Sequence, residues 1–368
     1  MMNKKNLYRW HRLAGLTLGF ILFVLALSGA LITYRDELLP LTYPEHFAVT
    51  PRSERAPLAT QLLAAQAASG GQSLTHFYTA EADDTASMAF YRPTGALLPH
   101  LVTVDPYSAQ VKGHMPLARN LFGVMLYLHA NLLLGKVGGW VVGLMGLITC
   151  AFVLSGLYLW WPRRQLWQRL TQLPHQGVRG LHRALGFFFA PLLLLLGLTG
   201  FALSFDLVEV LARPFSGAKT PETQLALDCD LSQQLKALEL LSAADQDHVV
   251  SLHLCSTKNG LMKITVGHDE RSGHHGFTRL IVDPRTPQIV QRFDTRSDPA
   301  SWHANSQIVY PLHTGASFGP VGRALVLLAG VALMGLFLTG LVPTLRKLRN
   351  SRQLSKKEPS PLTKPLEV

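Results

Sequence analysis

The chain has 368 residues, of which 15% are charged and 48% are hydrophobic, and its formal net charge is +11. The apolar residues gather in four runs of about 20 residues or more, long enough to cross the hydrocarbon core of a bilayer as helices. These runs are 13–34, 139–161, 184–205 and 321–345. They exclude a soluble enzyme and a disordered chain, and the sequence lacks the repeats of collagen or a coiled coil.

The positive charge is concentrated in three short segments next to the apolar runs. The basic residues of these segments are Lys4, Lys5, Arg9, Arg12, Arg163, Arg164, Arg169, Arg179, Arg183, Arg346, Lys347, Arg349, Arg352, Lys356, Lys357 and Lys364. Because cytoplasmic loops of membrane proteins are enriched in Lys and Arg, the pattern predicts that both termini and the middle link are cytoplasmic. Charge placed in this way argues against a nucleic-acid partner.

In chain order the sequence predicts eight segments that alternate between the membrane and the two aqueous sides. They are an N-terminus with the first span (1–34), an outer segment with a surface helix (35–138), the second span (139–161), a cytoplasmic link (162–183), the third span (184–205), a second outer segment (206–320), the fourth span (321–345) and a disordered tail (346–368). The first span is predicted to be an uncleaved anchor, because Tyr34-Arg35-Asp36-Glu37 follows it in place of a small-residue cleavage site.

The two halves of the chain resemble each other. Two pairs of blocks are separated by the same number of residues: His11-Arg12-x-x-Gly15 matches His182-Arg183-x-x-Gly186, and Leu27-Ser28-Gly29 matches Leu198-Thr199-Gly200. Three further pairs share a second spacing: Leu128-His129 matches Leu312-His313, Gly135-x-Val137-Gly138 matches Gly319-x-Val321-Gly322, and Leu154-Ser155-Gly156-Leu157 matches Leu338-Thr339-Gly340-Leu341. Two copies that each begin and end in the cytoplasm are parallel repeats. The predicted fold class is therefore a mainly α membrane protein, a four-helix bundle made of two parallel repeats, with two outer α+β segments.

Each outer segment is predicted to contain a helix and a strand–turn–strand unit. Val104-Asp105-Pro106 and Val282-Asp283-Pro284 mark the turns, because Pro fixes φ at the second turn position. Helices are expected at 56–68 and 231–241, and an amphipathic surface helix at 117–134.

The three cysteines divide between a span and an outer segment. Cys150 lies in the second span, where it is expected to be a small apolar filler. Cys229 and Cys255 share the second outer segment, in which an oxidising compartment would allow a disulfide, and the sequence leaves their pairing open.

Four of the 15 histidines have a counterpart in the other half. His11 and His182 stand at the cytoplasmic entrances of spans one and three, and His129 and His313 stand on the outer side before spans two and four. A planar tetrapyrrole takes two axial imidazoles from opposite faces, so this topology pairs His11 with His182 and His129 with His313 as iron ligands of two haems.

Arginine and glycine accompany these histidines. Arg12 and Arg183 each follow a histidine and would meet haem propionates at the cytoplasmic face. Small residues would give a macrocycle room between helices: Gly15, Gly29, Gly186 and Gly200. The alternative interpretation stays open, in which the histidines only anchor helix ends and the glycines only permit close packing.

Other polar groups suggest weaker hypotheses. His268, His274 and His275 would bind a transition metal such as zinc, or simply lie in an exposed polar loop. Acidic residues just outside spans one and three would be surface groups or would bind a proton or cation: Asp36, Glu37, Asp206 and Glu209. No nucleotide-binding, serine-hydrolase or zinc-protease motif occurs, so electrons would have to come from quinol or from a reductase partner.

Taken together, the His-Arg, Leu-His and Leu-Ser-Gly-Leu blocks, the Trp161-Pro162-Arg163 segment and their second-half counterparts resemble the PepSY-associated transmembrane helix family. This bacterial inner-membrane group includes iron-regulated membrane proteins and ferric-siderophore reductases. The resemblance covers nearly the whole chain before the tail. It implies four spans, PepSY-like periplasmic segments, two b-type haems and reduction of ferric chelates in the periplasm. Val342-Pro343 departs from the pattern, because it lacks the tryptophans found at Trp160-Trp161.

The resulting hypothesis is an inner-membrane oxidoreductase that takes electrons from quinol or a cytoplasmic reductase and reduces a ferric siderophore or another ferric chelate. Its iron ligands would be His11, His182, His129 and His313. One rival is a haem-free binding or regulatory protein whose PepSY-like segments bind a periplasmic partner. Another is a transporter, which would need discontinuous helices and charges at mid-membrane, and the four apolar runs carry no charge near their centres.

Overall fold

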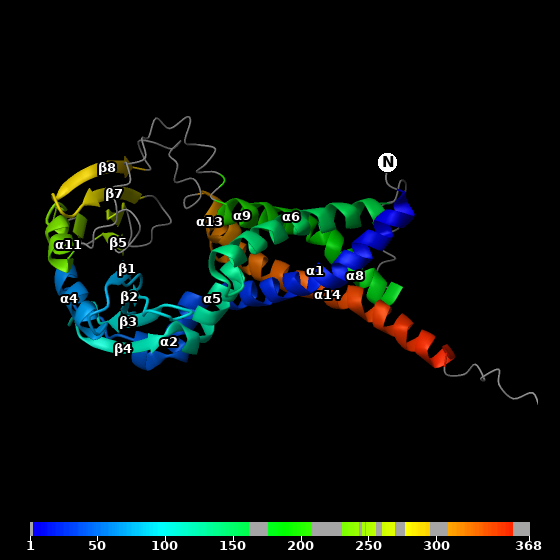
Figure 1. Cartoon of the computed structure of the whole chain (residues 1–368), viewed down its shortest axis with the longest axis horizontal. Coiled ribbons are helices and arrows are strands. Elements are labelled where there is room, and N and C mark those ends of the chain that lie inside the picture. Colours follow the sequence, from blue (N-terminus) through cyan, green and yellow to red (C-terminus); the bar gives the residue numbers. More distant parts are fainter. Residues whose placement is uncertain are drawn as a thin grey trace, which may run out of the picture.

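The computed structural model describes residues 3–161, 176–205, 207, 230–242, 245–246, 248–254, 260–268, 277–294 and 308–355. It consists of a helical bundle with a sheet domain at one end (Figure 1). The N-terminus and the last turns of the C-terminal helix lie at the opposite end of the bundle. We call the two ends of the bundle the sheet end and the N-terminal end.

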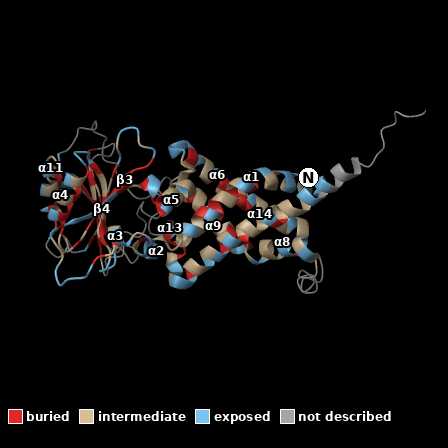
Figure 2. Cartoon of the chain, turned by 90° about the horizontal axis from the view of Figure 1, so that it is seen from below, coloured by how far each residue is buried: buried red, intermediate tan, exposed pale blue. Residues whose placement is uncertain are grey.

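Three helices of the described chain are long and apolar enough to span a membrane, and a bent pair of shorter helices makes a possible fourth span. The long helices are α1 (Lys4–Ile32), α6 (Gly135–Trp160) and α14 (Gly319–Ser355). Large apolar side chains on their outer faces are exposed, among them Phe20, Leu144 and Val331. Figure 2 shows few buried residues on the bundle compared with the sheet domain. Such an apolar exterior is stable in contact with lipid and unfavourable in contact with water.

The third predicted span, 184–205, contains a bend. It comprises the end of α8 (Gly177–Phe188), which begins within the predicted cytoplasmic link, and all of α9 (Ala190–Ser204), and the two helices are bent by 61° relative to each other. Pro191 stands in the first turn of α9, where it lacks the N–H that would bond one turn back and its ring clashes with the preceding turn. The bend lets α8 pack against α14 while α9 packs against α6. The helix is therefore discontinuous, one of the two features that the transporter interpretation requires.

Two further differences concern the ends of spans. Helix α14 continues to Ser355, so residues 346–355, predicted as part of a disordered tail, are helical. Residues 117–134 were expected to form one amphipathic surface helix, but they contain a 3-10 turn, η1 (Leu117–Arg119), and α5 (Leu121–Asn131). Helix α5 is apolar and packs against α1 and α6, because an apolar helix gains more by covering other helices than by lying on water.

The repeated Gly-x-Val-Gly block shapes two tight helical corners at the sheet end. Gly135 begins α6 and Gly319 begins α14, and both have a φ of +59°, a conformation that favours glycine. A Cβ at Gly138 would strike the Asn131 carbonyl at the end of α5. A Cβ at Gly322 would strike the Gly315 carbonyl, just after α13 (Tyr310–Thr314) and before η4 (Ala316–Phe318). The block thus folds each short helix back against the span that follows it.

The two outer segments join into one antiparallel sheet of eight strands, in the order β4-β3-β2-β1-β5-β6-β7-β8. The strands of the first half are β1 (Leu74–Tyr78), β2 (Ser87–Tyr91), β3 (His100–Val104) and β4 (Val111–Pro116). Those of the second half are β5 (Val249–His253), β6 (Met262–Gly267), β7 (Phe277–Asp283) and β8 (Gln288–Asp294). The halves meet where β1 pairs with β5, with His76 opposite His253.

The predicted turns and helices of the sheet domain are confirmed. Asp105 Oδ1 accepts hydrogen bonds from the backbone N–H of Tyr107 and Ser108, and Asp283 Oδ1 accepts one from Arg285, so both Asp-Pro turns use the aspartate as a side-chain acceptor. The predicted helices appear as α4 (Leu58–Ala68) and α11 (Leu231–Leu238).

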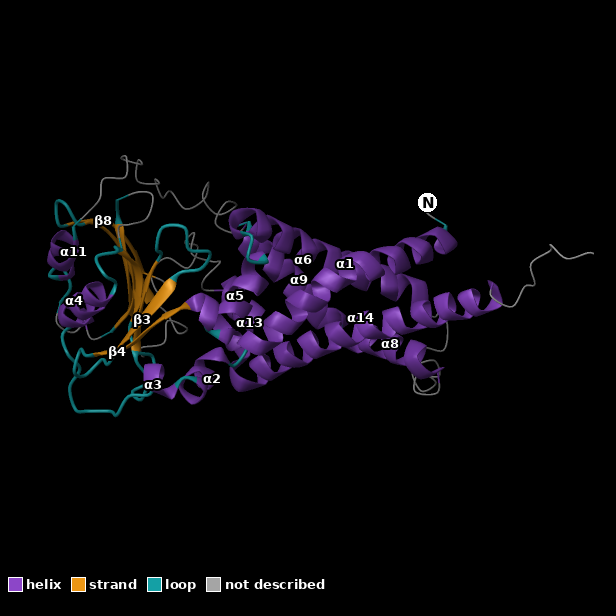
Figure 3. Cartoon of the chain, turned by 60° about the horizontal axis from the view of Figure 1, so that its bottom comes forward, coloured by secondary structure: helices purple, strands orange, loops and turns teal. Residues whose placement is uncertain are grey.

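Each face of the sheet has its own apolar core, and Figure 3 shows helices on both sides of the sheet. On one face α4 and α11 cover a cluster that crosses the junction of the halves and includes Phe77, Leu252 and Ile264. On the other face, α2 (Arg35–Thr42), α3 (Pro44–Phe47) and α5 cover a smaller cluster that includes Leu101 and Phe122. Through α2 and α5, this second cluster ties the sheet to the bundle.

An ion pair also holds the sheet end together. The guanidinium of Arg323 on α14 donates to both carboxylate oxygens of Glu37, 2.8 Å to Oε2, and to the Thr33 carbonyl at 2.7 Å. It also lies over the Tyr34 ring. The hydrogen bonds from Arg323 keep the pKa of Glu37 below its usual value. Glu37, expected from its position to be either a surface group or a cation site, is thus the partner of an arginine, and Asp36 pairs with Arg35.

Replacing Gly138 with Ala is expected to destabilise the protein by about 1–3 kcal/mol, because the new methyl group overpacks against the Asn131 carbonyl. Gly139→Ala is the matched control, since its nearest atom would be the Ala130 carbonyl at 4.0 Å and Ala favours a helix over Gly. Thermal unfolding of both variants in detergent checks this. Equal melting temperatures would contradict the proposed role of the close approach.

Candidate functional site

The four histidines with repeat counterparts lie in two pairs, one at each end of the bundle. His11 on α1 and His182 on α8 line one cavity at the N-terminal end. His129 on α5 and His313 on α13 lie at the sheet end, with ring centroids 6.2 Å apart. The folded chain thus brings together the same pairs that the sequence predicted.

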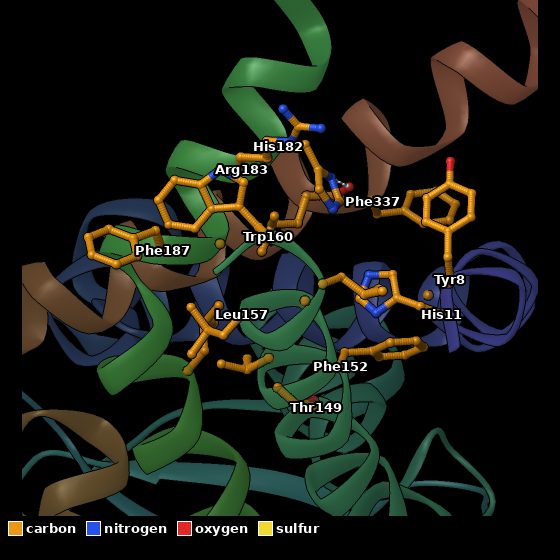
Figure 4. A pocket seen from close by; sticks show the side chains of 18 of the residues that line it. Tyr8, His11, Thr149, Phe152, Leu157, Trp160, His182, Arg183, Phe187 and Phe337 are labelled. Carbon is orange, nitrogen blue, oxygen red and sulfur yellow. Dashed lines mark hydrogen bonds between the residues drawn. The ribbon is translucent and has the colours of Figure 1, made fainter. Parts of the chain in front are cut away.

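The cavity at the N-terminal end has a volume of about 500 Å³, within the range of about 300–1,000 Å³ that is usual for small-molecule sites. Figure 4 shows His11 and His182 among aromatic and aliphatic side chains that surround it. His11 packs edge-on against Phe152, and Trp160 packs against Phe187. The predicted small residues Gly15 and Gly186 are also in its wall.

Hydrogen bonds fix both imidazoles in this cavity through Nδ1. His11 Nδ1 lies 2.8 Å from the Ser155 hydroxyl of α6. His182 Nδ1 lies 3.0 Å from both the Leu336 carbonyl and the Thr339 hydroxyl of α14. In each case the ring is hydrogen-bonded to the second span of its own half of the chain.

The sheet-end histidines are fixed in the same way, by the first span of each half. His129 Nδ1 lies 2.8 Å from the Leu25 carbonyl of α1. His313 Nδ1 lies 2.8 Å from the Thr199 hydroxyl of α9. The hydroxyl groups themselves donate to carbonyls one turn earlier in their helices, for example Thr199 to Leu195 at 2.7 Å, which leaves the hydroxyl oxygen to accept from the imidazole.

These partners decide which ring nitrogen carries the proton. A carbonyl oxygen can only accept, so Nδ1 of His129 and of His182 must be the N–H donor. In a neutral imidazole the other nitrogen, Nε2, then holds the lone pair that a metal binds. The hydrogen bond to Nδ1 is the usual outer-shell contact of a metal-binding histidine, which orients the ring and raises its basicity.

A glycine stands beside each histidine ring. A Cβ added to these glycines would lie 2.8 Å from Cε1 of His129 at Gly29, 3.3 Å from His313 at Gly200, 3.4 Å from His11 at Gly156 and 3.6 Å from His182 at Gly340. Each of these glycines follows the serine or threonine of a Ser/Thr-Gly step, at positions 28, 155, 199 and 339. Close ring contact therefore needs glycine most strictly at Gly29.

The donor set fits haem. An imidazole nitrogen binds a metal at about 2.0 Å and its ring centroid lies about 1 Å behind it, so two imidazoles on opposite sides of one ion have centroids about 6 Å apart. His129 and His313 have this spacing. No group of three or more His, Cys, Asp or Glu side chains that could hold a metal ion occurs among the described residues, whereas a bis-imidazole haem needs only two protein ligands.

Positive charge is present at one wall of the N-terminal cavity. Lys4, Lys5 and Arg183 line it, and Arg183 also donates to Gln176 at 2.5 Å. Arg12, which was predicted to meet a propionate, is exposed and does not belong to the lining.

Two further sequence candidates that the structure describes lie apart from this site. His268 lies 2.9 Å from the Thr278 hydroxyl and 3.6 Å from Asp294, in the sheet. Cys150 is buried in α6 as a free cysteine, and its Sγ lies 3.8 Å from the Leu194 carbonyl oxygen. Other candidates lie outside the described residues: Asp206, Glu209, Cys229, Cys255, His274 and His275.

Sequence reasoning missed the residues that hold the rings. Ser155, Thr199 and Thr339 were matched only as repeat markers, and the Leu25 carbonyl has no sequence signal at all. The signal that was available is the Ser/Thr-Gly step itself, which occurs once in each predicted span.

The model of the PepSY-associated TM region matches residues 8–347. No match was found among curated proteins. The matched region runs from the start of α1 to the basic end of α14, and it covers far more than half of the 368 residues. The chain is therefore a membrane protein that belongs to the PepSY-associated TM family.

Proposed function

We propose that this protein is an oxidoreductase of the bacterial inner membrane with two b-type haems, which passes single electrons across the bilayer to ferric chelates, in particular ferric siderophores, in the periplasm. The observation that carries the proposal is the set of four histidines, each held through Nδ1 by a span of its own half. At each end of the bundle, the two Nε2 atoms of one histidine pair are available to bind one iron.

The proposed topology has four spans in two parallel repeats, with α8 and α9 counted as one span and both termini in the cytoplasm. It is supported by the position of the N-terminus and the end of α14 at the same end of the bundle. The basic residues of both segments lie at that end, as cytoplasmic residues do. The joined sheet is then periplasmic and corresponds to the two PepSY-like segments.

When bound, haem supplies a one-electron iron couple. The residues of the chain hold and tune that couple. The hydrogen bond from each Nδ1 keeps the ring in the ligating tautomer. The apolar wall of the N-terminal cavity, including Phe152 and Phe337, excludes water, and the ammonium groups of Lys4 and Lys5 would neutralise propionates at its mouth.

The spacing of the two sites suits transfer across a bilayer. His11 and Gly29 both lie on α1, and Gly29 contacts His129. At a helix rise of ~1.5 Å per residue, the two sites are therefore about 27 Å apart along α1. This is close to the ~30 Å thickness of the hydrocarbon core. A histidine pair therefore stands near each surface of the membrane.

In the net reaction, one quinol becomes a quinone, releases two protons and reduces two ferric chelates to ferrous chelates, or a reduced cytoplasmic reductase supplies one electron for each ferric chelate. Hard oxygen donors bind ferric iron more tightly than ferrous iron, so the reduction weakens the chelate and releases the metal. The sheet domain, next to the His129–His313 pair, is the part of the chain that would meet the chelate.

Purified full-length protein is expected to contain two b-type haems per chain. Replacing His129 or His313 with Ala should leave one, and so should replacing His11 or His182, because a haem that loses one of its two axial ligands is no longer held. Reduced-minus-oxidised spectra and a pyridine haemochrome count measure this. His76→Ala, in the sheet, is the control and should keep both haems. Colourless protein from haem-replete cells would favour the haem-free binding or regulatory function instead.

Dithionite-reduced protein is expected to be reoxidised by ferric citrate or a ferric hydroxamate chelate, with one ferrous ion trapped by ferrozine for each electron lost. Anaerobic stopped-flow absorption measures the rate. The His313→Ala variant should react at least tenfold more slowly, because the sheet-end site is the one nearest the chelate. A protein with both haems that ferric chelates cannot reoxidise would contradict ferric reduction while leaving haem binding intact.

Ser155→Ala is expected to raise the midpoint potential of one haem by tens of millivolts, because His11 loses its Nδ1 acceptor and becomes a weaker donor. For scale, a tenfold change in relative stability of the two oxidation states corresponds to about 59 mV. Thr17→Ala is the control: the Thr17 hydroxyl of α1 donates to the Leu13 and Ala14 carbonyls, which are not the acceptors of the four histidines. Equal shifts in the two variants would show that the Ser155 contact does not tune the ligand.

A further inference from the structure

Three side chains with metal-binding atoms meet in the first half of the sheet. Tyr91 ends β2, His100 begins β3, and His114 lies on β4. The register pairs Tyr91 with His100 and Val102 with His114. Because residues two apart on a strand share a face, all three side chains lie on the same face of the sheet.

Their donor atoms converge on one point. Tyr91 Oη lies 2.6 Å from His114 Nε2, His100 Nδ1 lies 3.3 Å from the same Nε2, and Tyr91 Oη lies 3.4 Å from His100 Nδ1. Ligands that bind one metal at about 2.0–2.2 Å with angles between 90° and 109° are about 2.8–3.6 Å from one another. The observed triangle has this size, apart from its shortest edge, which is an ordinary O–H···N hydrogen bond.

A metal ion can use all three groups at once. Nε2 of a neutral imidazole has a single lone pair. Here two polar groups, the Tyr91 hydroxyl and His100 Nδ1, both lie within hydrogen-bond distance of His114 Nε2. Hydrogen bonds along the chain His114–Tyr91–His100 satisfy these groups pairwise, whereas a metal ion at the centre would use one lone pair from each of the three groups.

The surroundings favour an accessible ion. The Tyr91 ring is buried, with 4% of its surface exposed, while His114 is exposed and His100 half-buried, so the site opens to solvent on one side. The nearby Arg92 guanidinium donates to the Ala96 and Leu97 carbonyls of the β2–β3 loop.

We propose that Tyr91, His100 and His114 form a binding site for a late first-row divalent transition-metal ion, with Zn²⁺ and Cu²⁺ the best matches to two imidazoles and one phenol oxygen. The ion displaces the phenol proton, which leaves to solvent. Three protein ligands leave a further position for water or an exchangeable ligand. The site is independent of the four bundle histidines, so it stands whether or not the bundle binds haem.

The test is Zn²⁺ binding to the full-length protein in detergent, measured by calorimetry, with His114→Gln, Tyr91→Phe and the double variant. The wild-type chain is expected to bind one Zn²⁺ at this site. Binding should weaken about 100-fold in His114→Gln, about 10-fold in Tyr91→Phe, and disappear in the double variant. His248→Gln and Tyr107→Phe, elsewhere in the sheet domain, are the controls and should bind as the wild type does.

Added Cu²⁺ gives a readout that altered folding cannot mimic. Its electron paramagnetic resonance spectrum should show two equivalent imidazole nitrogens in the wild type and one in His114→Gln, with circular dichroism confirming that both proteins are folded. The proposal is overturned if Zn²⁺ binds the wild type and the double variant equally, or binds neither.

Discussion

The contact on which the rest of this structure depends is the hydrogen bond from a histidine Nδ1 to an acceptor on a neighbouring apolar helix. In an apolar environment an imidazole N–H without a partner is costly, and helix carbonyls are already engaged along their own helix. The structure meets this constraint with a Ser/Thr-Gly step: the hydroxyl or a carbonyl one turn earlier accepts the N–H, and the glycine leaves space for the ring. Each ring is thereby fixed in position and in tautomer.

The placement of the short helices follows from this contact. His129 reaches α1 only because α5 folds back against the span, and His313 reaches α9 only because α13 does so. The corners that make this possible depend on glycines at which a side chain would strike the backbone of the short helix. The backbone conformation of the glycine corners at the sheet end therefore determines where the imidazoles of His129 and His313 lie in the bundle.

The sheet gives the two halves of the chain a second connection. The β1–β5 pairing makes one sheet of the two outer segments, and a single apolar cluster crosses the junction. Arg323 adds a link between the start of α14 and the α1–α2 corner through Glu37 and Thr33. Any change in the relative position of the halves at the sheet end would alter the spacing of His129 and His313, so a rigid junction favours a constant site.

By itself the sequence determined the class of protein, the approximate spans, the hairpin turns and the pairing of His11 with His182 and of His129 with His313. These features follow from local composition, from Asp-Pro turn chemistry and from the match between the two halves. Composition and turn chemistry act over short stretches of chain, and the match is found by comparing the two halves directly. The family resemblance read from the same blocks is confirmed over residues 8–347.

Only the tertiary structure decided the bend at Pro191, the joined sheet, the acceptors of the four Nδ1 atoms and the lining of the cavity by Lys4 and Lys5 in place of Arg12. Each of these depends on which surfaces meet across long chain separations. The Leu25 carbonyl illustrates the reason: every residue has a carbonyl, and only packing of α5 on α1 makes this one the partner of a histidine. The convergence of Tyr91, His100 and His114 likewise arises from strand register, which residue spacing alone does not fix.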